Sequence, residues 1–297
     1  MAKGQAKDTS NGSYVLSGYF PRRNLINSIR NYHPQSTETT INLPANTEKS
    51  SNWAGYIDTP TSQNNSYTSI SGSWIVPTIS SAQQDTSAAQ WIGLGGVNSK
   101  DLLQMGTIEE IKNGQPTAEV FWEELPNVAQ NIMSIPIGST ISSSISKTSD
   151  STWNLVFTAT TPQGQTETKT ISTTLDSSYA EEIGTSGEWI SEDPSNQYSQ
   201  LFPLANAGTV KYQSATVNGT LLNSSSNTVH PVAMISSNGN VSIYPSTIET
   251  DGESFTTTTN ISSIAKHRFN NFPKYTLKNP NSKIHSRKSM SITVIFH

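Results

Sequence analysis

The sequence predicts an all-β fold, an antiparallel two-sheet β-sandwich, and three observations lead to this prediction. Short runs rich in β-branched and aromatic residues recur from Trp53 to about Thr257, without any long helical periodicity between them. Turn pairs such as Asn113-Gly114 and Asn218-Gly219 separate these runs. Hydrophobic residues make up only 33% of the chain and charged residues only 13%, so we expect outward strand faces rich in Ser and Thr.

The expected strands fall in one continuous segment, whose length suits a large two-sheet jelly roll of the concanavalin-like kind. The clearest runs are residues 72–76, 88–94, 118–123, 153–158, 188–192, 208–212 and 241–244. We therefore divide the chain into a leader and linker over residues 1–50, a sandwich domain over residues 51–257 and a poorly ordered tail over residues 258–297.

These three parts differ in charge. Residues 51–257 hold 19 Asp and Glu against 5 Lys and Arg, a balance of −14, whereas residues 1–50 balance at +3 and residues 258–297 at +7. The acidic middle argues against nucleic-acid binding, and its scarcity of bases limits charge repulsion when its carboxylates protonate in acid. The basic leader is interpreted either as an intramolecular inhibitor or as a disordered extension, and the basic tail either as a solvated extension or as an anion-binding arm.

Composition excludes several kinds of site. The chain has no cysteine, which excludes disulfides, thiolate zinc sites and cysteine nucleophiles. Of its five histidines only His230 lies in the sandwich, so a Ser-His-Asp triad or a metal centre has little support. No apolar run approaches the roughly 20 residues that cross a bilayer, and no signal peptide is visible at the start. We expect no metal, no organic cofactor and no membrane insertion.

Three expected strands carry polar side chains on a face that they share with apolar ones. Alternation along a strand groups Leu102, Gln104 and Gly106; Glu119, Phe121 and Glu123; and Glu188, Ile190 and Glu192. A carboxylate on an aromatic-lined sheet face is partly desolvated, which raises its pKa and prepares it for proton transfer. Taken singly, Gln104 fits a core amide and Glu192 fits an ordinary rim carboxylate equally well or better.

Seven short motifs, taken in order, favour a catalytic role for Gln104 and Glu192 over a purely structural one. They are Ser51–Tyr56 (SNWAGY), Trp74–Pro77 (WIVP), Gln90–Gly93 (QWIG), Leu103–Gly106 (LQMG), Trp122–Pro126 (WEELP), Glu188–Glu192 (EWISE) and Phe202–Asn206 (FPLAN). In this order the chain resembles the eqolisins, the glutamic peptidases, over some two-thirds of its length. Each motif alone is weak, but seven at compatible spacings form a specific signal. The lack of the disulfides found in fungal members points to a prokaryotic-type branch.

The resemblance implies roles for six residues. Gln104 and Glu192 would be the catalytic pair, and Trp53, Trp91, Glu119 and Glu123 would line the substrate cleft. Glu119 stands where the family pattern leads us to expect aspartate, and Phe121 where it leads us to expect tryptophan. The implied activity is that of an acid-acting endopeptidase, in which Glu192 and Gln104 hold the attacking water. Its partners would be protein or peptide substrates, and we expect an extracellular, monomeric enzyme that is made as a zymogen.

Two other classes of function remain open at this point. A glycoside hydrolase on a similar jelly roll would use two facing carboxylates, such as Glu123 and Glu192, and would not need Gln104. A carbohydrate-binding module would instead stack sugars on exposed aromatic side chains, and it would keep its binding after Glu192→Gln.

Overall fold

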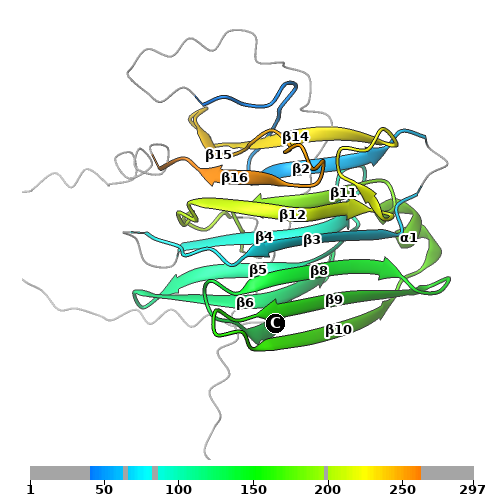
Figure 1. Cartoon of the computed structure of the whole chain (residues 1–297), viewed down its shortest axis with the longest axis horizontal. Coiled ribbons are helices and arrows are strands. Elements are labelled where there is room, and N and C mark those ends of the chain that lie inside the picture. Colours follow the sequence, from blue (N-terminus) through cyan, green and yellow to red (C-terminus); the bar gives the residue numbers. More distant parts are fainter. Residues whose placement is uncertain (1–40, 63–65, 82–85, 197–199, 262–297) are drawn as a thin grey trace, which may run out of the picture.

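A computed structural model of the chain describes residues 41–62, 66–81, 86–196 and 200–261 (Figure 1). These residues form sixteen β-strands and one short α-helix, which confirms the predicted all-β class. Residues 1–40 of the leader and residues 262–297 of the tail, with the expectations attached to them, lie outside the described part. The described part contains no helix that is long and apolar enough to span a bilayer.

The strands follow one another along the chain through connections of different lengths, the longest of which runs from β11 to β12. They are β1 (Glu48–Ser50), β2 (Trp53–Pro60), β3 (Ser69–Ile75), β4 (Thr86–Gly95), β5 (Leu102–Lys112), β6 (Gln115–Glu124), β7 (Gln130–Ser134), β8 (Thr140–Lys147), β9 (Thr152–Thr160) and β10 (Thr166–Thr174). The helix α1 (Ser177–Ile183) comes next, followed by β11 (Gly187–Glu192), β12 (Thr209–Val217), β13 (Thr220–Leu221), β14 (Asn227–Ile235), β15 (Val241–Pro245) and β16 (Phe255–Thr259).

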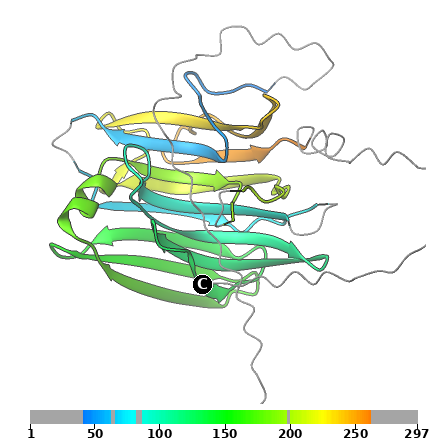
Figure 2. The same cartoon turned by 180° about the vertical axis from the view of Figure 1, so that it is seen from behind.

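The strands form two layers, which Figure 1 shows one behind the other and Figure 2 shows from the opposite side. The short layer has the strand order β10-β9-β8-β3, and the long layer has the order β16-β15-β14-β2-β11-β4-β5-β6-β7. Strand β12 connects them, because its first residues pair with β16 and its later residues pair with β3. A register shift between Gln213 and Thr216, with Ser214 at φ 53°, marks the bend between the two pairings.

Most strand pairs are antiparallel, as the turn signals predicted. Asn113 and Gly114 have φ values of 52° and 76°, and Asn218 and Gly219 have 48° and 72°, so both pairs occupy the left-handed region. Asparagine and glycine tolerate this region, and a turn with positive φ at both central residues matches the twist of a hairpin. Strand β1 is different, because it pairs in parallel with β14. This strand lies within residues 1–50, which the sequence patterns assigned to the leader and linker.

The main core lies between the layers and follows from strict alternation in the short layer. In β9 the side chains of Trp153, Leu155, Phe157 and Ala159 are buried, while those between them are only half-buried. They join a cluster that includes Trp189 of β11. Burying such apolar surface is the main source of stability, at roughly 25 cal/mol per Å² removed from water.

The long layer is buried on its other face as well. Every residue of β4 and of β11 is buried, so neither strand has a solvent-facing side. A second apolar cluster covers this outer face of the long layer. Its members are Trp53, Ile57, Ala89, Trp91, Val97, Leu102, Ile108, Phe121, Leu125, Ile190 and Val232, with Ala129 and Phe202 packed at its margin.

The helix α1 was not anticipated by the sequence patterns. Asp176 caps its N-terminus by accepting a hydrogen bond from the Tyr179 backbone N at 2.8 Å. The Tyr179 hydroxyl lies 2.9 Å from the carbonyl oxygen of Leu102 and 2.8 Å from that of Leu125. The helix therefore anchors the start of β5 and the loop after β6, both of which contribute to the second cluster.

Candidate active site

Strand register brings the predicted residues to one face of the long layer. Glu192 pairs with Trp53 of β2, and two residues earlier on β11, Ile190 pairs with Trp91 of β4. On β5, Gln104 pairs with Gly93 of β4 on one side and with Glu123 of β6 on the other. Because side chains alternate between the faces, all these positions point away from the main core and into the second cluster.

The Glu192 carboxylate is fully buried and is held by two donors. Its Oε1 accepts a hydrogen bond from Asn52 Nδ2 at 3.0 Å, and its Oε2 accepts one from Trp91 Nε1 at 2.7 Å. Burial raises the pKa of Glu192 to about 8, although the hydrogen bonds from Trp91 and Asn52 oppose this shift. Glu192 thus has the raised pKa and the fixed orientation expected of a proton-transfer group.

Gln104 is fixed by the neighbouring strand. Its Nε2 donates to Glu123 Oε2 at 2.6 Å, and both side chains are buried. This bond uses one of the two N–H groups of the amide and turns the NH2 group toward β6. Glu123, for which the family resemblance implied a place in the substrate cleft, lies directly against Gln104, where it can orient the amide.

Trp91 extends between the two candidate catalytic side chains. Its indole N–H reaches Glu192, while a Cβ added at Gly93 would lie 2.9 Å from its Cζ3 and 3.3 Å from Cβ of Gln104. On the other side, a Cβ at Gly106 would lie 2.4 Å from Cβ of Trp91. The two glycines therefore provide the space in which the indole lies across the strands.

The remaining predicted cleft residues lie on the same face. Trp53 is fully buried and packs edge-on against Trp91, with ring centroids 5.0 Å apart at an angle of 77°. Glu119 lies nearer the margin, where it is half-buried and accepts a hydrogen bond from Asn131 of β7. Both tryptophans are packed into the second cluster in this structure, and neither presents an exposed stacking surface.

Two further polar residues belong to the site, and the sequence patterns had not assigned them roles. Asn52 stands in the SNWAGY motif. Its place in this motif is the only sequence feature that could have pointed to a role for its amide. Asp193 follows Glu192, and its backbone N donates to the Asn52 carbonyl at 2.9 Å. Burial, followed by the charge of Glu192, raises the pKa of Asp193 well above its usual range.

A metal site in the described part of the chain would require a cluster of side chains that could bind the ion. No group of three or more His, Cys, Asp or Glu side chains there could hold an ion. Glu123 and Glu192, the two carboxylates that a glycosidase would use, are held by different partners, because Glu123 bonds to Gln104 while Glu192 bonds to Asn52 and Trp91.

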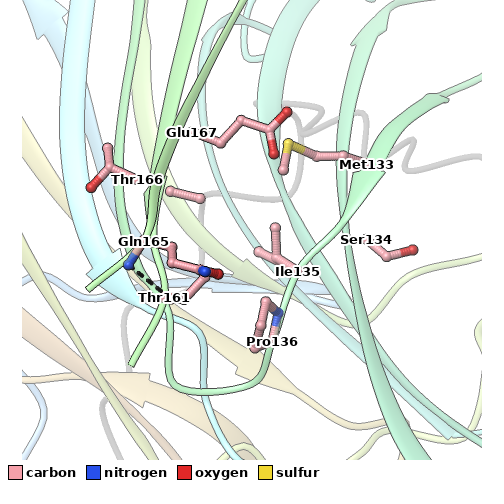
Figure 3. Close-up of a pocket in the computed structure, with 9 residues that line it drawn as sticks. Met133, Ser134, Ile135, Pro136, Thr161, Gln165, Thr166 and Glu167 are labelled. Carbon is pink, nitrogen blue, oxygen red and sulfur yellow. Dashed lines mark hydrogen bonds between the residues drawn. The ribbon is translucent and has the colours of Figure 1, made fainter. Parts of the chain in front are cut away.

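A hollow of about 300 Å³ lies elsewhere, between the segment after β7 and the β9–β10 hairpin (Figure 3). Met133, Ile135 and Pro136 form one wall, and Gln165 and Glu167 lie opposite. Glu167 forms an ion pair with Lys169 at 2.7 Å. With a single acid that is already paired, this hollow lacks the combination of groups found on the outer face of the long layer.

Comparison with solved structures identifies the same architecture. Scytalido-glutamic peptidase with a transition state analog inhibitor is similar with a TM-score of 0.56 at 20% identity, covering 71% of this chain and 98% of that one. SCP-B, a member of the eqolisin family in complex with the tripeptide Ala-Ile-His, is similar with a TM-score of 0.52 at 20% identity and the same coverages. At these identities the likeness establishes the fold. No curated protein sequence matches the chain.

The sequence model of the Peptidase A4 family matches residues 51–259, which is more than two thirds of the chain. The match covers β2 to β16, and with them every predicted site residue. It decides against the glycoside hydrolase and the carbohydrate-binding module. The chain belongs to the Peptidase A4 family and is a peptidase of the glutamic type.

Proposed function

We propose that this peptidase cleaves peptide bonds within proteins in acid, with Glu192 and Gln104 as its catalytic pair. Glu192 would remove a proton from a water molecule held between the two side chains, and the water would attack the scissile carbonyl carbon. The Gln104 NH2 group would donate to the developing oxyanion. Protonated Glu192 would then transfer its proton to the departing amine, so that the carboxylate is restored at the end of the cycle.

The observation that carries this proposal is the shared face of Glu192 and Gln104. They lie on two strands that flank β4, and the Trp91 indole on that strand reaches from one toward the other. Glu123 holds the Gln104 amide at 2.6 Å, which supports a fixed direction for its donors. A preorganised donor costs no reorganisation when the oxyanion forms, which is why such groups contribute strongly to catalysis.

The raised pKa of Glu192 restricts when it can act as a base. Burial is the largest cause of the value of about 8, and a neutral carboxyl group cannot accept a proton from water. Water that enters with a substrate removes part of the desolvation, while the bonds from Trp91 and Asn52 continue to favour the ionised form. We therefore assign activity in acid to the hydrated site, in which the pKa of Glu192 would be lower than in the fully buried arrangement.

The direct test is cleavage of a denatured protein at about pH 3 and pH 7 by matched variants. Glu192→Gln keeps the size of the side chain and removes the base, so we expect no measurable cleavage. Gln104→Ala removes the oxyanion donor and should lower kcat by about 10² to 10³. Exposed residues of the same types provide the controls, because Glu181→Gln and Gln165→Ala should cleave normally. Full activity of folded Glu192→Gln would exclude this mechanism.

The proposal includes a zymogen that acts outside the cell as a monomer. The basic leader would cover the acidic cleft at neutral pH and loosen as carboxylates protonate. Because β1 begins at Glu48, the informative truncation removes residues 1–40 and keeps this strand. We expect the truncated chain to be active at pH 3 without a lag, whereas the full chain requires incubation in acid. Equal lags in both chains would show that the leader does not restrain the enzyme.

A further inference from the structure

Asn52 connects the proposed catalytic strand to the segment that precedes the sandwich. It lies between β1 and β2 and is buried, with 8% of its surface exposed. Its Nδ2 donates to Glu192 Oε1 at 3.0 Å, and its carbonyl oxygen accepts from the Asp193 backbone N at 2.9 Å. The same residue thus holds both the side chain of Glu192 and the backbone directly after it.

Two serines fix the direction of the Asn52 amide. The hydroxyls of Ser50 and Ser51 each lie 3.4 Å from Asn52 Oδ1, to which they can donate. The Ser50 hydroxyl also accepts from the backbone N of Asn52 at 3.3 Å and from that of Trp53 at 3.0 Å. With its oxygen facing hydroxyl donors, the amide presents its NH2 group to the carboxylate.

Strand β1 holds this turn against the sandwich. Its three residues pair in parallel with β14, where Ser50 lies opposite Met234. At the other end of the strand, Glu48 Oε1 lies 3.0 Å from His230 Nδ1, and His230 Nε2 lies 3.2 Å from Thr59 Oγ1. Short pairing alone contributes little, but together with these side-chain bonds it fixes where the chain enters β2.

We propose that Asn52 is a positioning residue for Glu192, held by the β1 segment so that its amide fixes one carboxylate oxygen and leaves the base correctly turned toward the water. This inference rests on the proposed function, because it gives a role to a contact of the proposed base. Asn52 itself would touch neither the substrate nor the reacting atoms. It would act through Glu192 alone.

The charges around Glu192 make the amide important. Asp193 is the acidic neighbour, Glu48 and His230 lie at the far end of β1, and within the described residues Glu192 forms no ion pair with a base. The ionised carboxylate therefore depends on neutral donors, chiefly Trp91 and Asn52. Removing the Asn52 donor disfavours the ionised form, so the pKa of Glu192 rises further.

The experiment measures kcat and KM against pH for the full chain on an unstructured polypeptide, after the same acid incubation. Asn52→Leu keeps the shape of the side chain and removes the donor. In this variant the fall of kcat on the acid side of the pH profile (the acid limb) should move by about one unit to higher pH. This corresponds to roughly tenfold lower kcat below the limb, while KM stays unchanged. A limb that stays at the wild-type pH, or a change in KM alone, would overturn the positioning role.

Asn52→Asp provides a second test. Its side chain is isosteric with asparagine, so this variant should fold even if Asn52→Leu does not. Its protonated carboxyl can still donate to Glu192 in acid, so the acid limb should stay near that of the wild type. Once this group ionises, two adjacent carboxylates repel each other, and activity should be lost at the upper end of the pH range. A profile identical to the wild type at both ends would contradict the proposal.

Asn227→Leu is the matched control. Asn227 is a buried asparagine with 9% of its surface exposed, and it bonds to the Tyr67 hydroxyl at 3.0 Å, away from Glu192. Its loss should lower the melting temperature without moving the acid limb. A similar limb shift in this control would show that Asn52→Leu acts through general destabilisation. Glu192→Gln, measured in parallel, separates the two levels: if it retains activity, both the proposed mechanism and the role of Asn52 fail.

Discussion

Strand β9 of the short layer and strands β4 and β11 of the long layer bury their residues in different ways. In β9 every second side chain is buried, and the alternate side chains, among them Asn154 and Thr158, are half-buried and keep partial contact with solvent. In β4 and β11 no residue is exposed, although they include Gln90, Ser191 and Glu192. A sheet layer with one solvated face needs only alternation, whereas the long layer must accommodate polar groups between two apolar clusters.

This difference indicates where the chain departs from what stability alone would select. A buried carboxyl group without a positive partner is costly when ionised, and such groups are expected at functional sites. Asp58, Glu109, Glu188 and Glu192 are all buried in the long layer, and none of them forms an ion pair with a base in the described part of the chain. The short layer has no comparable buried acid among its described residues.

The largest effect should come from adding a methyl group inside the long layer. In Gly106→Ala the new Cβ would lie 2.2 Å from the Gln90 carbonyl oxygen and 2.4 Å from Cβ of Trp91, so β4 and β5 would have to separate. We expect a chain that fails to fold or loses its cooperative melting transition, measured by circular dichroism.

The control for this substitution lies in the short layer. Gly164, in the β9–β10 turn, has a φ of 83° and no neighbouring atom within 4 Å of an added Cβ. Gly164→Ala should cost only about 1 kcal/mol, because the left-handed backbone alone opposes it. Comparable melting of the two variants would show that close packing around Trp91 is not required.

The next largest effect should be the dependence of stability on pH. Burial raises the pKa of Asp58 to about 9 and that of Glu109 to about 8, and nearby side-chain hydrogen bonds only partly oppose it. Both groups are ordinarily acidic in the unfolded chain, so their favourable contribution is complete below about pH 4 and is lost as the pH rises through 8 to 9. The free energy of unfolding should fall by up to about 1.4 kcal/mol per pH unit for each such group.

Neutral isosteres sharpen this prediction. Asp58→Asn and Glu109→Gln should flatten the decline in melting temperature between pH 4 and pH 8, because neither side chain can ionise. The exposed Asp150 gives the control, and Asp150→Asn should leave the slope of the wild type unchanged. If all three variants decline as the wild type does, other groups cause the loss of stability.

The contrast between the alternating strand β9 and the fully buried strands β4 and β11 also explains how much could be predicted from the sequence. Alternation along β9 and the Asn-Gly turns are local signals, and they predicted the sandwich correctly. The order of the motifs predicted the family, and alternation grouped Gln104 and Glu192 with apolar neighbours on their own strands, whereas the pairing of the two residues came from the family resemblance. The contacts of Asn52 could not be predicted, because Asn52 and Glu192 are 140 residues apart and meet only through the pairing of β2 with β11.

Two other features escaped prediction for related reasons. Strand β1 has three residues and pairs in parallel with a distant strand, so it has too little pattern of its own to be distinguished from a linker. The helix α1 has seven residues, which is below the length at which helical periodicity becomes visible in a sequence. Glu123 was predicted to line the cleft, but its bond to Gln104 depends on the register between β5 and β6.

The smallest expected effect comes from one substitution made in both layers. Thr107 is fully buried, and its Oγ1 accepts the indole N–H of Trp74 at 3.1 Å, so Thr107→Val leaves that donor buried without this partner. The expected cost is about 1 to 3 kcal/mol in the free energy of unfolding, measured with urea.

The matched substitution lies in the short layer. Thr168 of β10 is exposed and shares a 3.0 Å hydrogen bond with Thr158, so water can replace the lost hydroxyl after Thr168→Val. The free energy of unfolding should change by no more than about 0.5 kcal/mol in Thr168→Val, because surface substitutions seldom exceed that value and valine suits an exposed strand position. Equal costs at the two sites would mean that the hydroxyls of the long layer are no more important to the fold than those that face solvent.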